Sequence, residues 1–516
     1  MRAHATATLA IALTAAAHAV PPPTAPPPTP LTAKVRAYRA AHETAIVAEL
    51  AELVSLPNVA TDLAAIERNA TALTATLERR GFTVQRLAAA EGTPPSLFAV
   101  LPNPAAKRRV VFYAHFDGQP VTPADWRSDP FRPVLRAGPE LGSPEVDLAT
   151  APALDPEWRL YARSASDDKA PIVAILTALD ALRDAGVAPS VEVALFLEGE
   201  EEQGSPHLRE ILARHADSLR ADLWLLCDGP VHASRRMQIF FGARGVSGLE
   251  LTTYGPLRPL HSGHYGNWAP NPAVSLARLI ATLRDDDGKI LVPGFYDDVR
   301  PLGAAERRAV DAMPAVEDAL REELALGRTE GGGRLQERLM LPALNLRGLR
   351  AGGVGDAATN AIPAEATASI DFRLVPDQTP ERVRERVEAH LRQQGWHLVS
   401  EEPDAATRRA QPRLLRLVWS LDYAGARTAM DLPASRAVAV VVDRATGGSL
   451  IQVPMLGGSV PMSLFADTLK VPLIGVPVVN HDNRQHAANE NLRLQNLWDG
   501  IEVFAALIAE LGGELR

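Results

Sequence analysis

The sequence predicts an α/β fold with a smaller α+β domain inserted into it. The chain has 516 residues, more than one hydrophobic core usually organises, so two domains are expected. In the N-terminal half, short apolar runs alternate with segments of helical periodicity, which is typical of a sheet covered by helices on both faces. From about Gly242 the strand patterns alternate between apolar and polar residues, which indicates a sheet with one polar face.

The N-terminus has the pattern of an export signal. Arg2 and His4 precede a weakly apolar run, and Ala17-His18-Ala19 has the small-x-small form of a signal-peptidase site. A short buried helix is the alternative interpretation of residues 1–19. The proline-rich residues 20–33 are expected to form an extended tether. We therefore predict a secreted or periplasmic protein whose mature form does not associate with a membrane.

The first domain is predicted to begin at Lys34. Helices are expected where apolar residues recur at helical spacing, and Pro57 and Gly81 are natural ends for the first two. Strands are expected where short runs are continuously apolar. The predicted helices cover residues 34–56, 63–80 and 171–182, and the predicted strands cover residues 97–101, 110–114, 191–197 and 223–226.

The inserted domain is recognised from its alternating strand. Thr367, Ser369, Asp371 and Arg373 alternate with apolar residues, and helices are expected at 272–284 and 380–393. The apolar run 471–478 then resumes the earlier pattern. The expected organisation is a catalytic domain of residues 34–241 and 433–516, interrupted by an insert of residues 242–432.

Composition narrows the classes of ligand. A net charge of −9 without a basic run argues against a nucleic-acid partner. Cys227 is the only cysteine, which excludes internal disulfides and zinc–thiolate clusters. A metal ion in this protein must therefore be held by histidine and carboxylate side chains.

Candidate ligands occur in five short segments, four of them beside predicted strand ends. Loops at strand ends converge on one crevice in α/β enzymes. Crowded carboxylates repel one another, and a divalent cation relieves that repulsion. The segments are Ala114–Pro120, Ser166–Lys169, Leu197–Ser205, Asp228 and Asn480–His486.

Each segment alone has a simpler interpretation. Asp167 or Asp168 could cap the following helix, since a carboxylate satisfies free N–H groups there. The acidic run from Glu198 to Glu202 could be a solvated surface patch. A lone histidine is more often structural than a ligand. The combination of all five segments is what favours a metal site.

Together these segments resemble the two-zinc clan that contains aminoacylase, carboxypeptidase G, succinyl-diaminopimelate desuccinylase and the carnosinase-type dipeptidases. The resemblance runs from about Lys34 to the C-terminus. It implies a zinc-dependent exopeptidase-like catalytic domain, with a mixed sheet covered by helices, and an inserted lid or dimerisation domain. The matching motifs include Ala114–Pro120, Leu160–Lys169, Glu198–Ser205, Asp228, His261-Ser262-Gly263, Ile362–Ala366 and Gly457–Pro461.

The resemblance also implies roles for single residues. One zinc would be held by His115, Asp167 and Asp228, and a second zinc by Asp167, Glu202 and His486, so that Asp167 bridges the two. Mn²⁺ or Co²⁺ is a possible replacement for Zn²⁺. Asp117 would orient His115, and Glu201 would be the general base that takes a proton from water and passes it to the leaving amine. A cis peptide between Asp167 and Asp168 is a further implication.

Four residues are candidates for substrate binding. His261 resembles the oxyanion-stabilising histidine of the family, and the resemblance further implies a homodimer in which His261 acts on the neighbouring subunit's site. Arg373 lies on the polar face of its strand, where it could bind a substrate carboxylate or simply pair with Asp371. Asn360 and Ser459 are further candidates.

Three functions compete at this point. A dipeptidase acting on small peptides fits best, because the Gly457–Pro461 loop and the ending at His486 resemble the carnosinase-type branch. An N-acyl-amino-acid deacylase would share the same catalytic centre. A non-catalytic binding protein on the same fold is the third reading, and the complete set of ligands with Glu201 counts against it.

Overall fold

The computed structural model describes residues 29–515. The predicted signal segment and residues 20–28 of the tether lie outside that range, so the export prediction stays a prediction. Helix α1 (Pro30–Val54) starts inside the predicted tether, four residues earlier than expected. Proline is favourable in the first turn of a helix, and the Thr29 hydroxyl accepts a hydrogen bond from the backbone N–H of Thr32.

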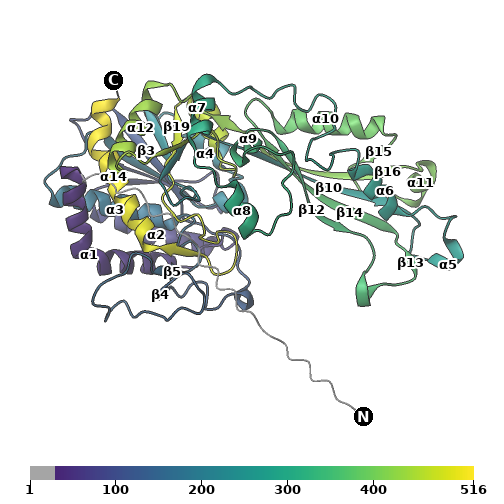
Figure 1. Ribbon diagram of the computed structural model, residues 1–516, viewed down its shortest axis with the longest axis horizontal. Helices are drawn as coiled ribbons and strands as arrows, with labels where there is room; N and C mark the ends of the chain where they lie inside the picture. The colour runs from purple at the N-terminus through teal and green to yellow at the C-terminus, as the bar shows by residue number, and fades with distance from the viewer. Residues whose placement is uncertain (1–28, 516) are drawn as a thin grey trace, which may run out of the picture.

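The larger of the two main sheets has eight strands (Figure 1). β3 is parallel to both of its neighbours, β6 and β7, and β19 is parallel to β7, whereas β1, β2 and β6 are antiparallel. The sheet is therefore mixed, as predicted. Its strand order is β1 (Thr83–Leu87), β2 (Ser96–Leu101), β6 (Glu192–Glu198), β3 (Arg109–His115), β7 (Leu223–Leu226), β19 (Leu473–Gly475), β8 (Gln238–Phe240) and β18 (Ile451–Val453).

Helices cover both faces of this sheet, which confirms the predicted fold class. On β3, Val110 and Phe112 enter one hydrophobic core, while Val111 and Tyr113 enter the other. Successive side chains of a strand point to opposite faces, so a continuously apolar strand requires cover on both. The first core includes α1, α2 (Leu63–Arg79), α3 (Lys169–Asp184), α12 (Pro433–Ala445) and α14 (Leu494–Glu514), and the second includes α4 (Leu208–Arg214) and α13 (Met462–Leu469).

A second sheet of five strands lies to one side of the first (Figure 1). On β14 the side chains of Ala368, Ile370 and Phe372 are buried in the core that includes α6 (Pro272–Ile280) and α10 (Pro380–Gln393). The opposite face is polar, as the alternating pattern predicted. The strand order is β12 (Ala343–Arg350), β14 (Glu365–Leu374), β10 (Gly245–Tyr254), β16 (Leu414–Tyr423) and β15 (His397–Val399).

Short elements connect the two sheets and complete the fold. A three-stranded sheet joins β4 (Val134–Arg136), β5 (Arg159–Tyr161) and β20 (Asn491–Arg493). Two small ribbons pair β9 (Gly242–Ala243) with β17 (Ala426–Arg427), and β11 (Leu260–His261) with β13 (Ala361–Ile362). The remaining helices are α5 (Ser262–Tyr265), α7 (Ala304–Ala312), α8 (Glu317–Glu323), α9 (Leu335–Leu339) and α11 (Ala405–Ala410), with 3₁₀ turns at Pro123–Asp125, Glu201–Gln203 and Gly355–Ala357.

The predicted strand 471–478 is shorter than expected, because only Leu473–Gly475 pairs in the sheet. Among the helices of residues 29–515, none combines the length and the hydropathy needed to cross a bilayer.

Gly475 allows β19 to lie against β8. A Cβ atom at this position would lie 2.0 Å from the Phe240 ring, inside the core. We expect Gly475→Ala to destabilise the protein by about 1–3 kcal/mol, because overpacking displaces neighbouring side chains. A lower midpoint of thermal unfolding, measured beside Gly142→Ala, checks this. Gly142 is the control because a Cβ there meets nothing within 4 Å. Equal midpoints for the two variants would contradict the packing argument.

Candidate metal centre

The candidate ligands meet at one edge of the eight-stranded sheet. His115 is the last residue of β3 and pairs with Glu198, the last residue of β6. Asp228 follows the end of the neighbouring β7 by two residues. Because these three strands are parallel, their carboxyl ends lie together, and the loops that follow them converge.

Asp167 and Asp168 approach the same place from the start of α3, and the peptide bond between them is cis, as the resemblance implied. A single buried carboxylate holds the segment before them. Glu490 Oε1 accepts hydrogen bonds from the backbone N–H groups of Ser166 and Asp167, both at 2.9 Å. Its Oε2 accepts from Arg163 Nη1 at 2.8 Å and from the Ser164 N–H at 2.9 Å.

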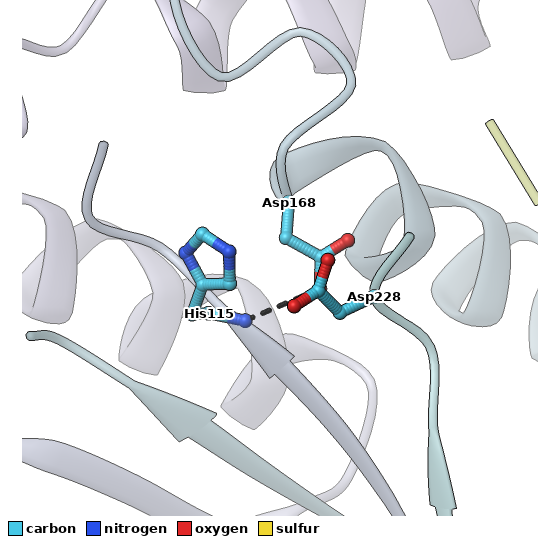
Figure 2. A group of neighbouring side chains, drawn as sticks. All are labelled: His115, Asp168 and Asp228. Atoms are coloured by element: carbon cyan, nitrogen blue, oxygen red, sulfur yellow. Dashed lines mark hydrogen bonds between the residues drawn. The ribbon is translucent and has the colours of Figure 1, made fainter. Parts of the chain in front are cut away.

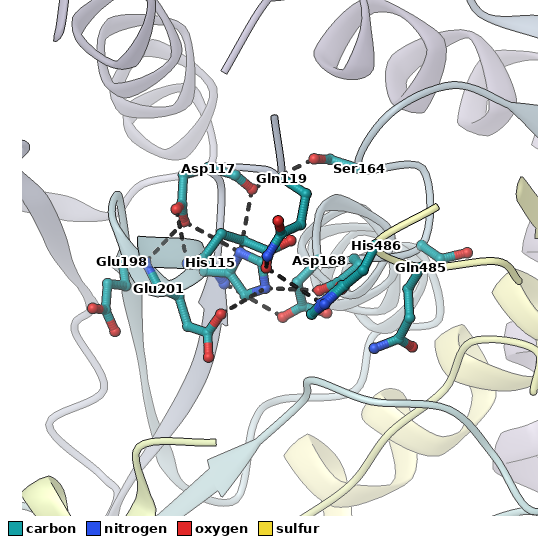
Figure 3. A network of polar contacts seen from close by, with 12 residues as sticks. His115, Asp117, Gln119, Ser164, Asp168, Glu198, Glu201, Gln485 and His486 are labelled. Carbon is teal, nitrogen blue, oxygen red and sulfur yellow. Dashed lines mark hydrogen bonds and ion pairs between the residues drawn. The ribbon is translucent and has the colours of Figure 1, made fainter. Parts of the chain in front are cut away.

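Asp167 lies between the two histidines, and Figure 3 shows the polar network around His115 and His486. Its Oδ1 is 2.9 Å from His115 Nε2, and its Oδ2 is 3.1 Å from His486 Nε2. Glu202 Oε2 is 3.3 Å from the same His486 nitrogen. Asp167, Glu202 and His486 thus form one group whose ligand atoms all lie within 4.8 Å of one another.

The second group contains His115, Asp168 and Asp228, again within 4.8 Å (Figure 2). The sequence interpretation placed Asp167 in this group and considered Asp168 only as a cap of the following helix. Asp168 occupies the N-cap position of α3, but its side chain makes no capping hydrogen bond. Instead its Oδ2 accepts from the backbone N–H of His115 at 3.3 Å. The capping interpretation therefore does not explain this carboxylate.

Asp117 contacts both the histidine and the acidic turn. Its Oδ1 lies 3.3 Å from His115 Nδ1, which orients the ring so that Nε2 faces Asp167. The two carboxylate oxygens of Asp117 also accept hydrogen bonds from the backbone N–H groups of Glu201 and Glu202, at 3.1 and 3.0 Å. Asp117 therefore fixes the position of a ligand candidate and of the general-base candidate together.

The acidic run after β6 is not a solvated patch. Glu198 is fully buried and accepts a hydrogen bond from the Tyr113 hydroxyl at 2.8 Å. Glu200 is also buried and lies 2.8 Å from His207 Nδ1. Glu201 points back to the centre, with its Oε2 3.9 Å from His115 Nε2.

Burial and mutual repulsion dominate the electrostatics of the centre. Burial, followed by the charge of Asp167, raises the pKa of Glu202 to about 8 and that of Asp228 to about 6. Burial also raises the pKa of Glu201 well above its usual range. For Asp167, burial opposes ionisation, but contacts with His115 and His486 lower its pKa below the usual range. Glu201, Glu202 and Asp228 thus lack enough positive charge around them to offset burial and mutual repulsion.

The donor set fits divalent cations. Within residues 29–515, Asp168 Oδ1 and Glu202 Oε1 are buried and have no hydrogen-bond partner. Oxygen and imidazole nitrogen are the ligand atoms that zinc and related metals bind in the absence of cysteine. A metal ion would coordinate these unpartnered oxygens and would compensate the negative charge of the neighbouring carboxylates.

The predicted substrate residues separate into two places. Arg373 Nη1 donates to Ser459 Oγ at 2.8 Å, and Arg373 Nε donates to Asp371 at 3.0 Å. His261 and Asn360 lie beside one another, since the Asn360 carbonyl accepts from the N–H of Ser262. However, α5, which begins directly after His261, and β13, which begins directly after Asn360, lie at the end of the five-stranded sheet farthest from the eight-stranded sheet (Figure 1). Both residues are exposed there.

Sequence reasoning missed three contributors to the centre. Asp168 was considered only as a helix cap and not as a ligand. Gln119, whose Nε2 donates to Glu202 Oε2 at 2.7 Å, was not singled out within its motif. Glu490 lies four residues beyond His486 in a stretch without strand or helix pattern. The one feature of the sequence that could have indicated Glu490 is its position as a single acidic residue shortly after the last ligand candidate, His486.

Comparisons with known proteins identify the family of this chain. The model of peptidase family M20/M25/M40 matches residues 111–510. The Cys-Gly metallodipeptidase of Schizosaccharomyces pombe is 26% identical over 489 residues, which cover 90% of this chain and 95% of that protein. Human beta-Ala-His dipeptidase is 27% identical over 432 residues, covering 81% of this chain and 78% of that protein.

Solved structures show the same fold. An M20 family metallo-carboxypeptidase from Sulfolobus solfataricus has a TM-score of 0.75 and 27% identity, covering 90% of this chain and 99% of its own. Human carnosine dipeptidase 1 also has a TM-score of 0.75, with 24% identity, covering 94% of this chain and all of its own. The family match spans most of the chain and includes every ligand candidate. The chain therefore belongs to peptidase family M20/M25/M40, whose members are metal-dependent.

Proposed function

We propose that this protein is a dipeptidase that uses two divalent metal ions to hydrolyse the amide bond of small peptides. Zn²⁺ is the metal that we propose for both positions. The observation that carries the proposal is the pair of adjoining ligand groups joined by the Asp167–Asp168 segment. The two curated relatives described above are dipeptidases by name, which favours dipeptides over N-acyl amino acids. The retained carboxylate of Glu201 argues against a purely binding function.

Asp167 is the residue best placed to bridge two metals, because one of its oxygens faces each histidine. His115 and Asp228 would complete one site, with Asp168 beside them, and Glu202 and His486 would complete the other. When bound, the metals would polarise the scissile carbonyl and lower the pKa of a water molecule toward neutrality. The side chain of His486 is 55% exposed, so the centre is open to solvent on that side.

Glu201 would move the proton. Its carboxylate takes a proton from the attacking water and delivers it to the nitrogen of the leaving amine. Two features support this role. Hydrogen bonding of its backbone N–H to Asp117 fixes its position, and burial, which raises its pKa, lets the carboxylate hold a proton between the two transfers.

Replacing this group tests the assignment. We expect Glu201→Gln to lower kcat by about 10²–10⁴-fold, the usual contribution of a general acid–base group, while the metal content stays at the wild-type value. Glu202→Gln is the matched comparison, because it should lose metal. Kinetics on dipeptides beside elemental analysis measure both effects. Loss of metal from the Glu201 variant, or a near-normal rate, would show that the two glutamates are misassigned.

Metal removal tests the wider proposal. We expect chelation to abolish activity reversibly and to lower the thermal midpoint, because removing the cations leaves buried carboxylates uncompensated and withdraws a ligand that stabilises the folded state. Activity and midpoint should both return on adding Zn²⁺. Full activity in protein confirmed to be free of metal would refute metal dependence.

We further propose that the active unit is a homodimer in which His261 and Asn360 serve the partner subunit's metal centre. Their position far from the centre of their own chain supports this. The same end of the five-stranded sheet also carries exposed apolar side chains that a partner could cover. They include Trp268, which is 79% exposed, and Val354, which is 84% exposed. β12 is an edge strand of its sheet with most residues exposed, and it offers unpaired backbone groups to a second chain.

Mixing two inactive variants tests this arrangement. If His261 acts across the interface, heterodimers of His261→Ala and Glu201→Gln contain one intact site, and random pairing returns about a quarter of wild-type activity. The control mixture is Glu201→Gln with Asp228→Ala. Both lesions there fall in the site of their own chain, so no activity should return. An inactive first mixture, with subunit exchange verified, would contradict the proposal.

A further inference from the structure

Arg244 lies where the two main sheets join, between β9 and β10. Its side chain is nearly buried, with the residue 9% exposed. The guanidinium Nε donates to the Gly457 carbonyl at 2.9 Å. Within residues 29–515, no carboxylate forms an ion pair with this guanidinium, and its two terminal nitrogens make no hydrogen bond. The charge of Asp371 acts on Arg244 only at longer range than an ion pair. In residues 29–515 the terminal nitrogens of Arg244 are also not among the buried polar atoms that lack a partner, so they reach open space where an anion could bind.

Arg244 and Arg373 contact the same loop. The backbone N–H of Arg244 donates to the Gly458 carbonyl, one residue beyond its Nε contact, and Arg373 Nη1 donates to Ser459 Oγ. Their strands are also neighbours, since Val246 pairs with Arg373. Burial, and then the charge of Arg373, lowers the pKa of Arg244 to about 10. Two guanidinium groups are thus held close together at the Gly457–Ser459 loop.

This pair lies beside the metal centre. Tyr423 pairs with Val246 in the adjacent strand and is buried. Tyr423 shares a hydrophobic core with Leu226, which lies two residues before Asp228. A Cβ atom on Gly229, directly after Asp228, would lie 3.7 Å from Leu456, which directly precedes the Gly457–Ser459 loop, so this loop adjoins the catalytic carboxylates. An anion at the two arginines would therefore belong to a substrate whose scissile bond reaches Glu201.

We propose that Arg244 is the second cation of the substrate-carboxylate site and acts with Arg373 to select peptides with a free C-terminal carboxylate. This inference rests on the proposed dipeptidase function. The charges agree with a single carboxylate, because the two arginines and Asp371 together carry one net positive charge. The free terminal nitrogens of Arg244 supply donors of the kind that guanidinium groups use to bind carboxylates.

A purely structural role is the competing explanation, in which Arg244 only anchors the Gly457 loop. Arg236 provides a matched control, because its Nε also donates to a backbone carbonyl, that of Ser449, at 2.9 Å. The experiment uses the full-length, metal-loaded enzyme with Cys-Gly and its C-terminal carboxamide. KM and kcat are measured for wild type, Arg244→Met, Arg244→Lys and Arg236→Met, with thermal midpoints for each.

We expect Arg244→Met to raise KM for Cys-Gly by about 10- to 100-fold, the usual effect of losing a charge-assisted hydrogen bond, and to change KM for the carboxamide little. Arg244→Lys should recover part of the loss, and Arg236→Met should leave the preference for the free acid unchanged. An equal effect of Arg244→Met on acid and amide would overturn the proposal.

Binding to the inactive enzyme gives a second readout. Calorimetry of Cys-Gly with Glu201→Gln, with and without Arg244→Met, should show the same 10- to 100-fold weakening, independent of turnover. Unchanged affinity would also overturn the role of Arg244. If the wild-type enzyme neither hydrolyses nor binds any dipeptide, the proposed function itself fails, and that outcome is separate from a loss of preference for the carboxylate.

Discussion

Glu490 has no exposed surface, and its two oxygens accept hydrogen bonds from three backbone N–H groups and one guanidinium between residues 163 and 167. Charge-assisted bonds to backbone N–H groups are among the stronger polar contacts in proteins. Because Glu490 follows His486 by only four residues, this one carboxylate ties the Asp167 segment to the loop that carries the last histidine. The distances between Asp167 and His486 depend on it, and with them the geometry of the whole centre.

The elements that sequence periodicity could predict are those whose pattern is local. The runs 110–114 and 193–197 within the predicted strands are continuously apolar because both of their faces are covered, and the structure places β3 and β6 there. The three-stranded sheet of β4, β5 and β20 was missed. Its strands have three residues each, too few to show a period, and β20 pairs with β5 across more than 300 residues of sequence. Short non-local pairing leaves no local signal.

The candidate site shows the same division. His115, Glu202 and Asp228 could be predicted as metal ligands from the sequence, because carboxylates and histidines that follow buried apolar strands are typical of a functional site at the sheet edge. The order of contacts within the site could not be derived, since whether Asp167 or Asp168 faces a given histidine depends on the local backbone. The position of His261 could not be predicted either. Its sequence distance from Asp228 does not show that β10 and β11 carry the chain to the far end of the five-stranded sheet.

The spacing of the ligands along the chain has a consequence for how the protein is made. His115 and His486 contact opposite oxygens of Asp167, although 371 residues separate them. Closing so long a loop lowers the entropy of the chain, and this cost is offset only when the long-range contacts form late in folding. During synthesis the two candidate ligand groups cannot both be complete until nearly the entire polypeptide has left the ribosome. Assembly of the candidate metal centre is therefore one of the last steps of folding, and a truncated chain that ends before residue 486 lacks one of the two histidines.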